Sequence, residues 1–276
     1  MVFVEMLKSR WRSADTLLCV GLDPDRSRFP QPLRNSSNSI FEFCRTIVDA
    51  TADLVCAFKP QIAYFASAGA ENELQRLIAY IRKTHPTIPV ILDAKRGDMP
   101  STAEHYAREV FERYNAHAVT LSPYLGFDSI APYLSYADRG AFLLGRTSNA
   151  GGADLQMLNV GGEHLYERVA RLAATWNSSG QLGLVVGATY PDELARVRAI
   201  VGEMPLLVPG IGTQGGDVKA SVAAGQTSRG AGMVINSSRA ILYASHDEDF
   251  AAAARRAAQS ARDEINRHRL AAAATN

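Results

Sequence analysis

Residues 90–113 read VILDAKRGDMPSTAEHYAREVFER, an apolar run that ends in charged residues and is followed by an amphipathic stretch. The run Val90–Asp93 shows no alternation of polar and apolar residues, which is typical of a strand buried on both faces of a parallel sheet. The stretch Ser101–Arg113 has the length and pattern of a helix. We therefore expect one unit of a parallel β/α fold here.

The same unit recurs along the chain. In all, eight short apolar runs alternate with longer amphipathic stretches. Eight strands with interposed helices predict an α/β fold, the (β/α)8 TIM barrel, and a doubly wound sheet is the alternative. The expected strands are Leu17–Gly21, Leu54–Phe58, Val90–Asp93, Ala118–Leu121, Ala141–Leu144, Gly183–Gly187, Leu206–Val208 and Gly232–Asn236. The expected helices are Ile40–Ala52, Glu71–Thr84, Ser101–Arg113, Glu163–Trp176 and Pro191–Val201, with shorter ones near Asp128–Tyr136 and Gly215–Ala224.

Two further helices are expected outside this pattern. Residues 2–13 predict an N-terminal helix packed across one end of the barrel. Residues 247–272 are rich in alanine and arginine and predict a long C-terminal helix. Because no linker or readable repeat divides the chain, residues 1–276 are expected to form a single (β/α)8 barrel domain.

Composition limits the partners of the chain. With 29 basic and 28 acidic residues, it lacks the clustered basic excess that nucleic acids require. No apolar stretch reaches the roughly 18 residues of a membrane span, and no signal-peptide pattern opens the chain. Cys19, Cys44 and Cys56 include no C-x-x-C pair, which argues against a disulfide framework and a zinc site. We expect a cytoplasmic protein with no nucleic-acid or membrane partner.

Charged residues follow the second and third expected strands. Asp93 and Lys95 are two residues apart, so on an extended strand their side chains point to the same face. With Lys59 after the second strand and Asp98 beyond the third, they could form an alternating charge network that keeps every member ionised. A lysine held beside carboxylates stays protonated and suits a proton donor. The alternative is a purely structural cluster of salt bridges.

The loop after the seventh expected strand, PGIGTQGG at 209–216, contains G-x-G-x-x-G from Gly210 to Gly215. A dinucleotide site would also need an acidic residue at the end of the next strand, where this chain has Asn236. A late glycine-rich loop, followed by a helix that opens with Ser238 and Arg239, fits a barrel phosphate site better. Backbone N–H groups would bind the dianion, and Arg239 would add a charge-assisted hydrogen bond.

The remaining motifs say less about function. Residues 146–149, RTSN, follow the fifth expected strand and could contact a polar ligand ring through hydroxyl and amide groups. The six histidines show no H-x-x-H or H-E-x-x-H spacing, so we expect no metal site. No G-x-S-x-G elbow of a serine hydrolase is present. We expect no cofactor.

Four motifs together carry a family resemblance. Residues 93–98 match D-x-K-x-x-D, and GLDP at 21–24, FKP at 58–60 and the loop at 209–216 complete the set in the family's order. Over roughly residues 15–243 the chain resembles the orotidine 5′-monophosphate decarboxylases, in the form of their longer bacterial branch. The resemblance implies a TIM barrel that removes CO2 from orotidine 5′-monophosphate to give UMP, in de novo pyrimidine biosynthesis and without a cofactor.

The resemblance also implies catalytic roles. Lys95 would protonate C6 of the pyrimidine, and Asp93 would lie against the departing carboxylate. Lys59 and Asp98 would complete the network. In this family the second aspartate of the motif reaches the neighbouring active site, so Asp98 implies a homodimer with shared active sites.

Substrate-binding residues are implied in the same way. Asp23 and Lys59 would bind the ribose hydroxyls, and Thr102 would contribute across the dimer interface. Ser148 and Thr147 would meet the edge of the pyrimidine. The phosphate would be held by Gln214, Gly215, Ser238 and Arg239.

Three alternatives remain at this point. D-x-K-x-x-D also occurs in Mg2+-dependent sugar-phosphate lyases of the same scaffold, which would need a further acidic ligand where this chain has Lys59. A non-catalytic nucleotide-binding barrel would keep the phosphate loop and lose the charge network. A Schiff-base aldolase would need a neutral lysine, whereas carboxylates flank Lys95.

Overall fold

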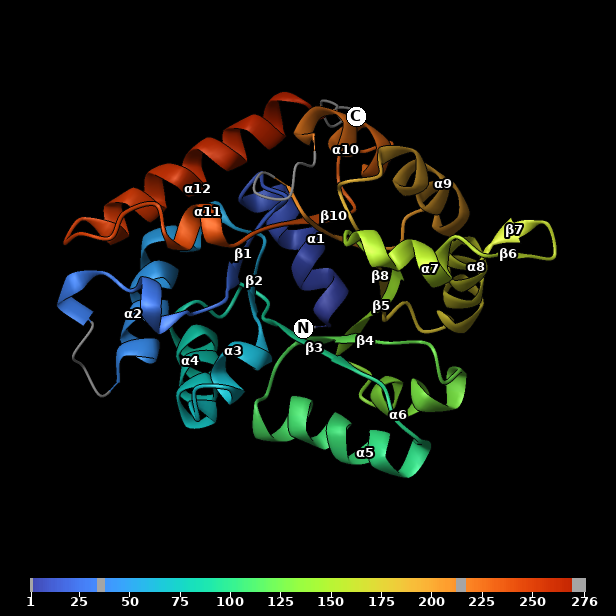
Figure 1. The fold of residues 1–276 in the computed structure, drawn as a ribbon, viewed down its shortest axis with the longest axis horizontal. Coiled ribbons are helices and arrows are strands. Elements are labelled where there is room, and N and C mark those ends of the chain that lie inside the picture. Colours follow the sequence, from blue (N-terminus) through green and yellow to red (C-terminus); the bar gives the residue numbers. More distant parts are fainter. Residues whose placement is uncertain (1, 34–37, 212–216, 270–276) are drawn as a thin grey trace.

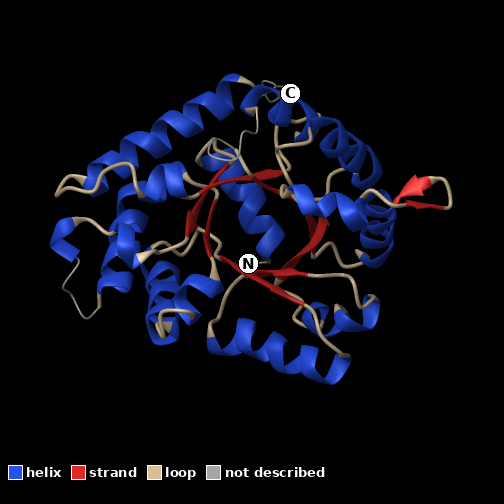
Figure 2. Cartoon of the chain, viewed as in Figure 1, coloured by secondary structure: helices blue, strands red, loops and turns tan. Residues whose placement is uncertain are grey.

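The central feature of the fold is a ring of parallel strands, seen end-on in Figures 1 and 2. The computed structural model describes residues 2–33, 38–211 and 217–269. The strands follow the order β2-β1-β10-β9-β8-β5-β4-β3, and parallel bridges from Phe58 to Val90 and from Gln61 to Asp93 join the two ends. The sheet is thus a (β/α)8 barrel and not a doubly wound sheet. The strands are β1 (Leu18–Leu22), β2 (Ala57–Pro60), β3 (Ile91–Arg96), β4 (Ala118–Leu121), β5 (Gly140–Arg146), β8 (Leu182–Val186), β9 (Leu206–Pro209) and β10 (Met233–Ser237).

Helices surround the ring on the outside (Figure 2). Their apolar faces cover the strands, which are almost entirely buried. Within the described residues, no helix combines the length and apolar character needed to cross a membrane. The helices are α1 (Phe3–Ser13), α2 (Ser39–Thr51), α3 (Ile62–Ala66), α4 (Glu71–Thr84), α5 (Pro100–Arg108), α6 (Ala131–Leu134), α7 (Ala153–Gln156), α8 (Leu165–Trp176), α9 (Pro191–Val201), α10 (Val218–Gly225), α11 (Arg239–Leu242) and α12 (Phe250–Arg267).

The expected N-terminal helix, α1, packs across the amino-terminal end of the barrel. Phe3 is buried, and its ring meets that of Phe142 edge-on at 5.8 Å between centroids. Gly140 makes room for it, because a Cβ there would overlap the Phe3 ring. Arg10 donates hydrogen bonds to the carbonyl of Val55, just before β2. The helix therefore closes the floor of the barrel away from the strands' carboxyl ends.

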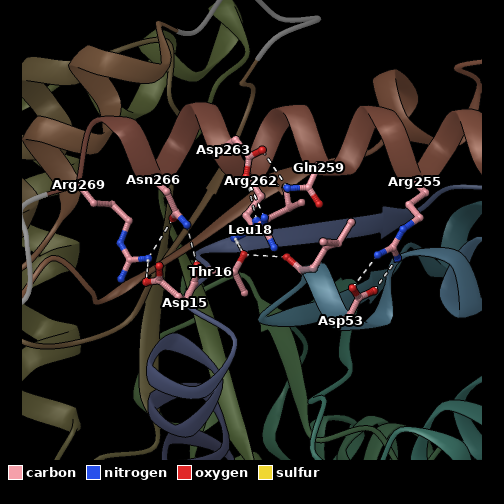
Figure 3. Close-up of polar contacts among 11 residues, drawn as sticks. Asp15, Thr16, Leu18, Asp53, Arg255, Gln259, Arg262, Asp263, Asn266 and Arg269 are labelled. Carbon is pink, nitrogen blue, oxygen red and sulfur yellow. Dashed lines mark hydrogen bonds and ion pairs between the residues drawn. The ribbon is translucent and has the colours of Figure 1, made fainter.

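The C-terminal helix α12 lies on its own barrel, against α2 and β1, and polar contacts hold both its ends (Figure 3). Near its start, Arg255 pairs with Asp53 at 2.7 Å. Near its end, Arg269 pairs with Asp15 at 2.9 Å, and Asn266 donates to the Asp15 carbonyl. The contacts span the face of the barrel from the turn before β1 to the turn before β2.

Two expected helices differ in detail from the structure. The segment Ser101–Arg113 is not one regular α-helix, because α5 ends at Arg108 and a π-helical turn follows at Glu109–Arg113. The expected helix Glu163–Trp176 starts two residues later, because Glu163–His164 forms β7 and pairs with β6 (Asn159–Val160) in a small hairpin. This hairpin projects from the barrel beside α8 (Figure 1).

Candidate active site

The carboxyl ends of the barrel strands surround a cavity of about 510 Å³. Apolar side chains from β5, β8 and β9 form part of its wall, and polar residues from the strand ends form the rest. This is the end of a TIM barrel at which catalytic groups ordinarily lie. The lining residues are Asp23, Lys59, Asp93, Lys95, Thr120, Leu144, Thr147, Ser148, Asn149, Gln156, Val185, Leu207, Pro209, Gly210, Ile211, Asn236, Ser238 and Arg239.

A chain of charged side chains occupies one side of the cavity. The Asp93 carboxylate accepts from Lys59 Nζ at 2.8 Å through one oxygen and from Lys95 Nζ at 2.7 Å through the other. Lys59 and Asp93 are almost fully buried, whereas 47% of the Lys95 side chain is exposed, and Lys95 is one of the residues that line the cavity. Lys95 therefore offers an ammonium to a ligand while Asp93 holds its position.

Burial and charge oppose each other within this chain. Burial alone would raise the pKa of Asp93, but the two neighbouring ammonium groups outweigh it and hold that pKa well below its usual range. Burial alone would lower the pKa of Lys59, but Asp93 and Asp23 outweigh it and raise that pKa. Asp93 and Lys59 therefore both stay charged at neutral pH.

Thr120, at the end of β4, organises the same group and was not predicted from the sequence. Its hydroxyl donates to Asp93 at 2.8 Å and accepts the backbone N–H groups of Ala94 and Lys95 at 3.1 and 2.9 Å. Lys95 has a left-handed φ of +46°, which is costly for a residue with a side chain. The Thr120 hydrogen bonds hold this strained turn. The sequence signal that could have identified Thr120 is its hydroxyl group within the otherwise apolar strand Ala118–Leu121.

Most of the predicted ligand-binding residues meet at this cavity. Asp23, Thr147, Ser148, Ser238 and Arg239 all line it. One carboxylate oxygen of Asp23 is buried without a hydrogen-bond partner among the described residues. The predicted phosphate ligands Gln214 and Gly215 lie outside the described part of the chain.

Two predicted residues lie apart from the charge chain. We expected Asp98 in the network, but its carboxylate accepts from the backbone N–H of Met99 at 2.8 Å, and no ion pair joins it to the lysines within the described residues. Thr102 is exposed on α5. Both residues follow β3 in the chain, and neither is among the described residues that line the cavity.

Three further polar residues, Asn149, Gln156 and Asn236, line the cavity. Of these, only Asn149 was expected near a ligand, as the amide of the RTSN segment. Asn149 falls in the RTSN segment, and Asn236 is a buried polar residue at a strand end, so both carried a signal. No sequence signal marked Gln156, because it lies on the short helix α7 and reaches the cavity only through the fold of the segment after β5.

Comparison with known proteins agrees with this geometry. The model of the orotidine 5′-phosphate decarboxylase / HUMPS family matches residues 16–257. The chain belongs to this family. Among members of the orotidine 5′-phosphate decarboxylase family, the protein of that name from Dechloromonas aromatica (strain RCB) is 64% identical over 270 residues, 98% of this chain and 100% of that protein. The one from Cupriavidus necator is also 64% identical, over 98% of this chain and 99% of its own length.

Solved structures within the orotidine 5′-phosphate decarboxylase family share the barrel. Leishmania donovani OMP decarboxylase superposes with a TM-score of 0.84 and 42% identity, over 97% of this chain and 98% of that one. L. donovani UMP synthase gives a TM-score of 0.86 and 44% identity, over 97% of this chain and 56% of that one.

Proposed function

We propose that the chain decarboxylates orotidine 5′-monophosphate to UMP, a cofactor-free step of de novo pyrimidine biosynthesis. The observation that carries the proposal is the Lys59–Asp93–Lys95 chain at the ends of β2 and β3, with a half-exposed ammonium facing the cavity. Family membership and relatives named orotidine 5′-phosphate decarboxylase support the same reaction.

Lys95 acts as the proton donor. The bond between C6 and the carboxylate breaks, CO2 leaves, and the electron pair stays on C6. The Lys95 ammonium stabilises this developing charge and then gives its proton to C6, after which solvent returns a proton to the amine. Asp93 lies against the departing carboxylate and fixes the ammonium, with Lys59 neutralising its charge inside the protein.

The remaining lining residues bind the parts of the substrate that do not react. Asp23 and Lys59 bind the ribose hydroxyls, and the unpartnered Asp23 oxygen supports this role. Arg239 and Ser238, with Gln214 and Gly215 of the glycine-rich loop, bind the phosphate. Ser148 meets the edge of the pyrimidine, and Thr147 contributes to this contact through the turn that carries Ser148. Binding energy gained at the phosphate orients the ring at Lys95.

A homodimer completes the site. Asp98 and Thr102 are not among the residues that line their own cavity, and they contribute to that of the neighbouring subunit. Exposed apolar residues beside them support this assembly: Met99 is 62% exposed, and Tyr124 and Leu125, after β4, are 81% and 41% exposed. The loops after β3 and β4 are adjacent, because Ser122 donates to the Arg96 carbonyl and a Cβ at residue 97 would touch Ser122.

Mixing two inactive variants tests the shared site. Lys95→Ala and Asp98→Ala homodimers each lack a required group at every site. A hybrid dimer contains one site with both changes and one intact site. Activity that returns on mixing supports the homodimer, whereas two variants that stay inactive together, under conditions in which labelled subunits exchange, contradict it.

The setting is the cytoplasm, which suits three cysteines that are all buried and unpaired.

A Mg2+-dependent lyase on this scaffold is the less favoured function, because Lys59 occupies the second strand end and pairs with Asp93. The fall in absorbance as the protein converts orotidine 5′-monophosphate to UMP, with EDTA present, tests the proposal. Turnover that EDTA leaves unchanged supports it; a folded protein without turnover contradicts it.

A further inference from the structure

Gln156, on α7, fastens the turn that follows β5. Its Oε1 accepts from the Thr147 backbone N–H at 2.9 Å and from Arg146 Nη1 at 3.3 Å. Its Nε2 donates to Thr147 Oγ1 at 2.9 Å. Gly152 lies so close that a Cβ there would be 2.8 Å from both Gln156 Oε1 and Thr147 Oγ1. The side-chain amide therefore fills the centre of the turn.

The donors around Gln156 determine which way its amide faces. A backbone N–H and a guanidinium can only donate, so the Gln156 atom between them must be the oxygen. Arg146 is itself held, because it is 2% exposed and its guanidinium lies 3.8 Å from the centroid of the Tyr190 ring. Gln156 Nε2 is thereby directed at the Thr147 hydroxyl, which must accept.

The same reasoning extends to Asn149. With its oxygen accepting from Gln156, the Thr147 hydroxyl donates its proton to Asn149 Oδ1, which lies 2.7 Å away. The other possible acceptor, Gln156 Oε1, lies 3.2 Å away, and 2.7 Å is the ordinary length of an O–H···O bond. The Asn149 carbonyl oxygen is therefore used within the turn, which leaves its NH2 group as the part that can donate to a ligand. Asn149 lines the cavity together with Ser148.

We propose that Gln156 is a positioning residue for base recognition: through Thr147, it turns the Asn149 amide so that Nδ2 donates to a carbonyl oxygen of the pyrimidine ring. The inference rests on the proposed function and deepens it. Uracil and orotate carry carbonyls at C2 and C4 that accept such a hydrogen bond, whereas cytosine keeps the C2 carbonyl and has a donating amino group at C4. A preference for UMP over CMP therefore reports a contact at C4. Thr147 acts within the turn, and Asn149 and Ser148 meet the base.

Gln156→Glu is the decisive variant. Glutamate keeps the shape and the oxygen that faces the Thr147 N–H and Arg146, but it replaces the Nε2 donor by an acceptor. The Thr147 hydroxyl then donates to the new carboxylate, and Asn149 loses the bond that orients it. We expect UMP to bind about tenfold more weakly, while ribose 5-phosphate, which lacks the base, binds as to the wild type.

Four further variants sharpen the test. Gly152→Ala, at a residue with an ordinary φ of −57°, displaces Gln156 and should repeat the effect. Thr147→Val should do the same, whereas Thr147→Ser keeps the hydroxyl and should retain UMP affinity. Gln75→Ala, at an exposed glutamine on α4, is the matched control and should leave both affinities unchanged.

Titration of each variant with UMP, CMP and ribose 5-phosphate, beside the KM and kcat for orotidine 5′-monophosphate, reads the outcome. Loss confined to UMP, with reduced preference over CMP and a higher KM, supports the proposal. Unchanged UMP binding by Gln156→Glu overturns it, and so does an equal loss for ribose 5-phosphate. Failure of the wild type to decarboxylate would instead refute the proposed function.

Discussion

Replacing Thr120 by valine should damage both stability and catalysis, because one buried hydroxyl holds the strained turn at Lys95. Valine keeps the shape and removes a hydrogen bond to the Asp93 carboxylate and the acceptor of two backbone N–H groups. A hydrogen bond to a charged group contributes about 1.5–3 kcal/mol, and a buried N–H left without a partner adds to the loss. We expect the free energy of unfolding to fall by about 2–4 kcal/mol.

The catalytic effect should be larger than the loss of one hydrogen bond suggests. Without the Thr120 acceptor, the left-handed conformation of Lys95 loses its support, and the ammonium moves relative to the substrate carbon. Misplacement by about 1 Å can lower a rate on the order of 100-fold, so we expect such a fall in kcat/KM. Urea denaturation measures the loss of stability, and the decarboxylation assay measures the fall in kcat/KM. Thr120→Ser is the control, because it keeps the hydroxyl and should keep wild-type stability and kcat/KM. Wild-type stability and kcat/KM in Thr120→Val would refute this account of the turn.

Four other substitutions probe the barrel and its charges. Asp93→Asn removes the carboxylate that pairs directly with buried Lys59, so the free energy of unfolding near pH 7 should fall by about 3–5 kcal/mol. Because the folded-state pKa of Asp93 is lowered, its contribution is present above the ordinary carboxyl pKa of about 4 and is lost as the pH falls toward the folded value. Urea denaturation at about pH 3 should therefore show a smaller difference, and a constant difference would contradict the pKa direction. Arg269→Ala should lower the free energy of unfolding by about 1–3 kcal/mol, because the Arg269 side chain is only 10% exposed. Arg255→Ala removes one partner of an exposed ion pair and should lower it by at most about 1 kcal/mol. Equal losses in urea denaturation would contradict the expected effect of burial. Phe3→Ala should lower stability by about 3–5 kcal/mol and leave kcat/KM unchanged, which thermal unfolding and the activity assay would check.

Much of the barrel follows from patterns that act locally. Continuous apolar runs form strands when helices cover one face and the barrel interior covers the other, so the eight expected strands overlap the observed ones. The period of two along a strand predicted that Asp93 and Lys95 would meet, and their side chains are 2.7 Å apart. The backbone that brings these two side chains together is not the regular extended strand that we expected. Lys95 adopts a left-handed conformation at an irregularity in the β3–β4 pairing.

The unpredicted features depend on contacts between distant segments. Thr120 became part of the site only because β3 and β4 are neighbours. Gln156 returns to Thr147 across a short turn and helix that carry no apolar period. Asp98 matches its motif, yet its side chain accepts from the backbone N–H of Met99, and a partner on another subunit, as we propose for it, could not be found from the pattern of one chain.

The most direct test of the central claim is the turnover of orotidine 5′-monophosphate by Lys95→Ala beside the wild type, with UMP binding measured for both. The account predicts that the variant folds and binds UMP, while its kcat falls by several orders of magnitude, because the group that stabilises and protonates C6 is gone. A variant that retains a kcat within about tenfold of the wild type would contradict the role of Lys95 as the proton donor.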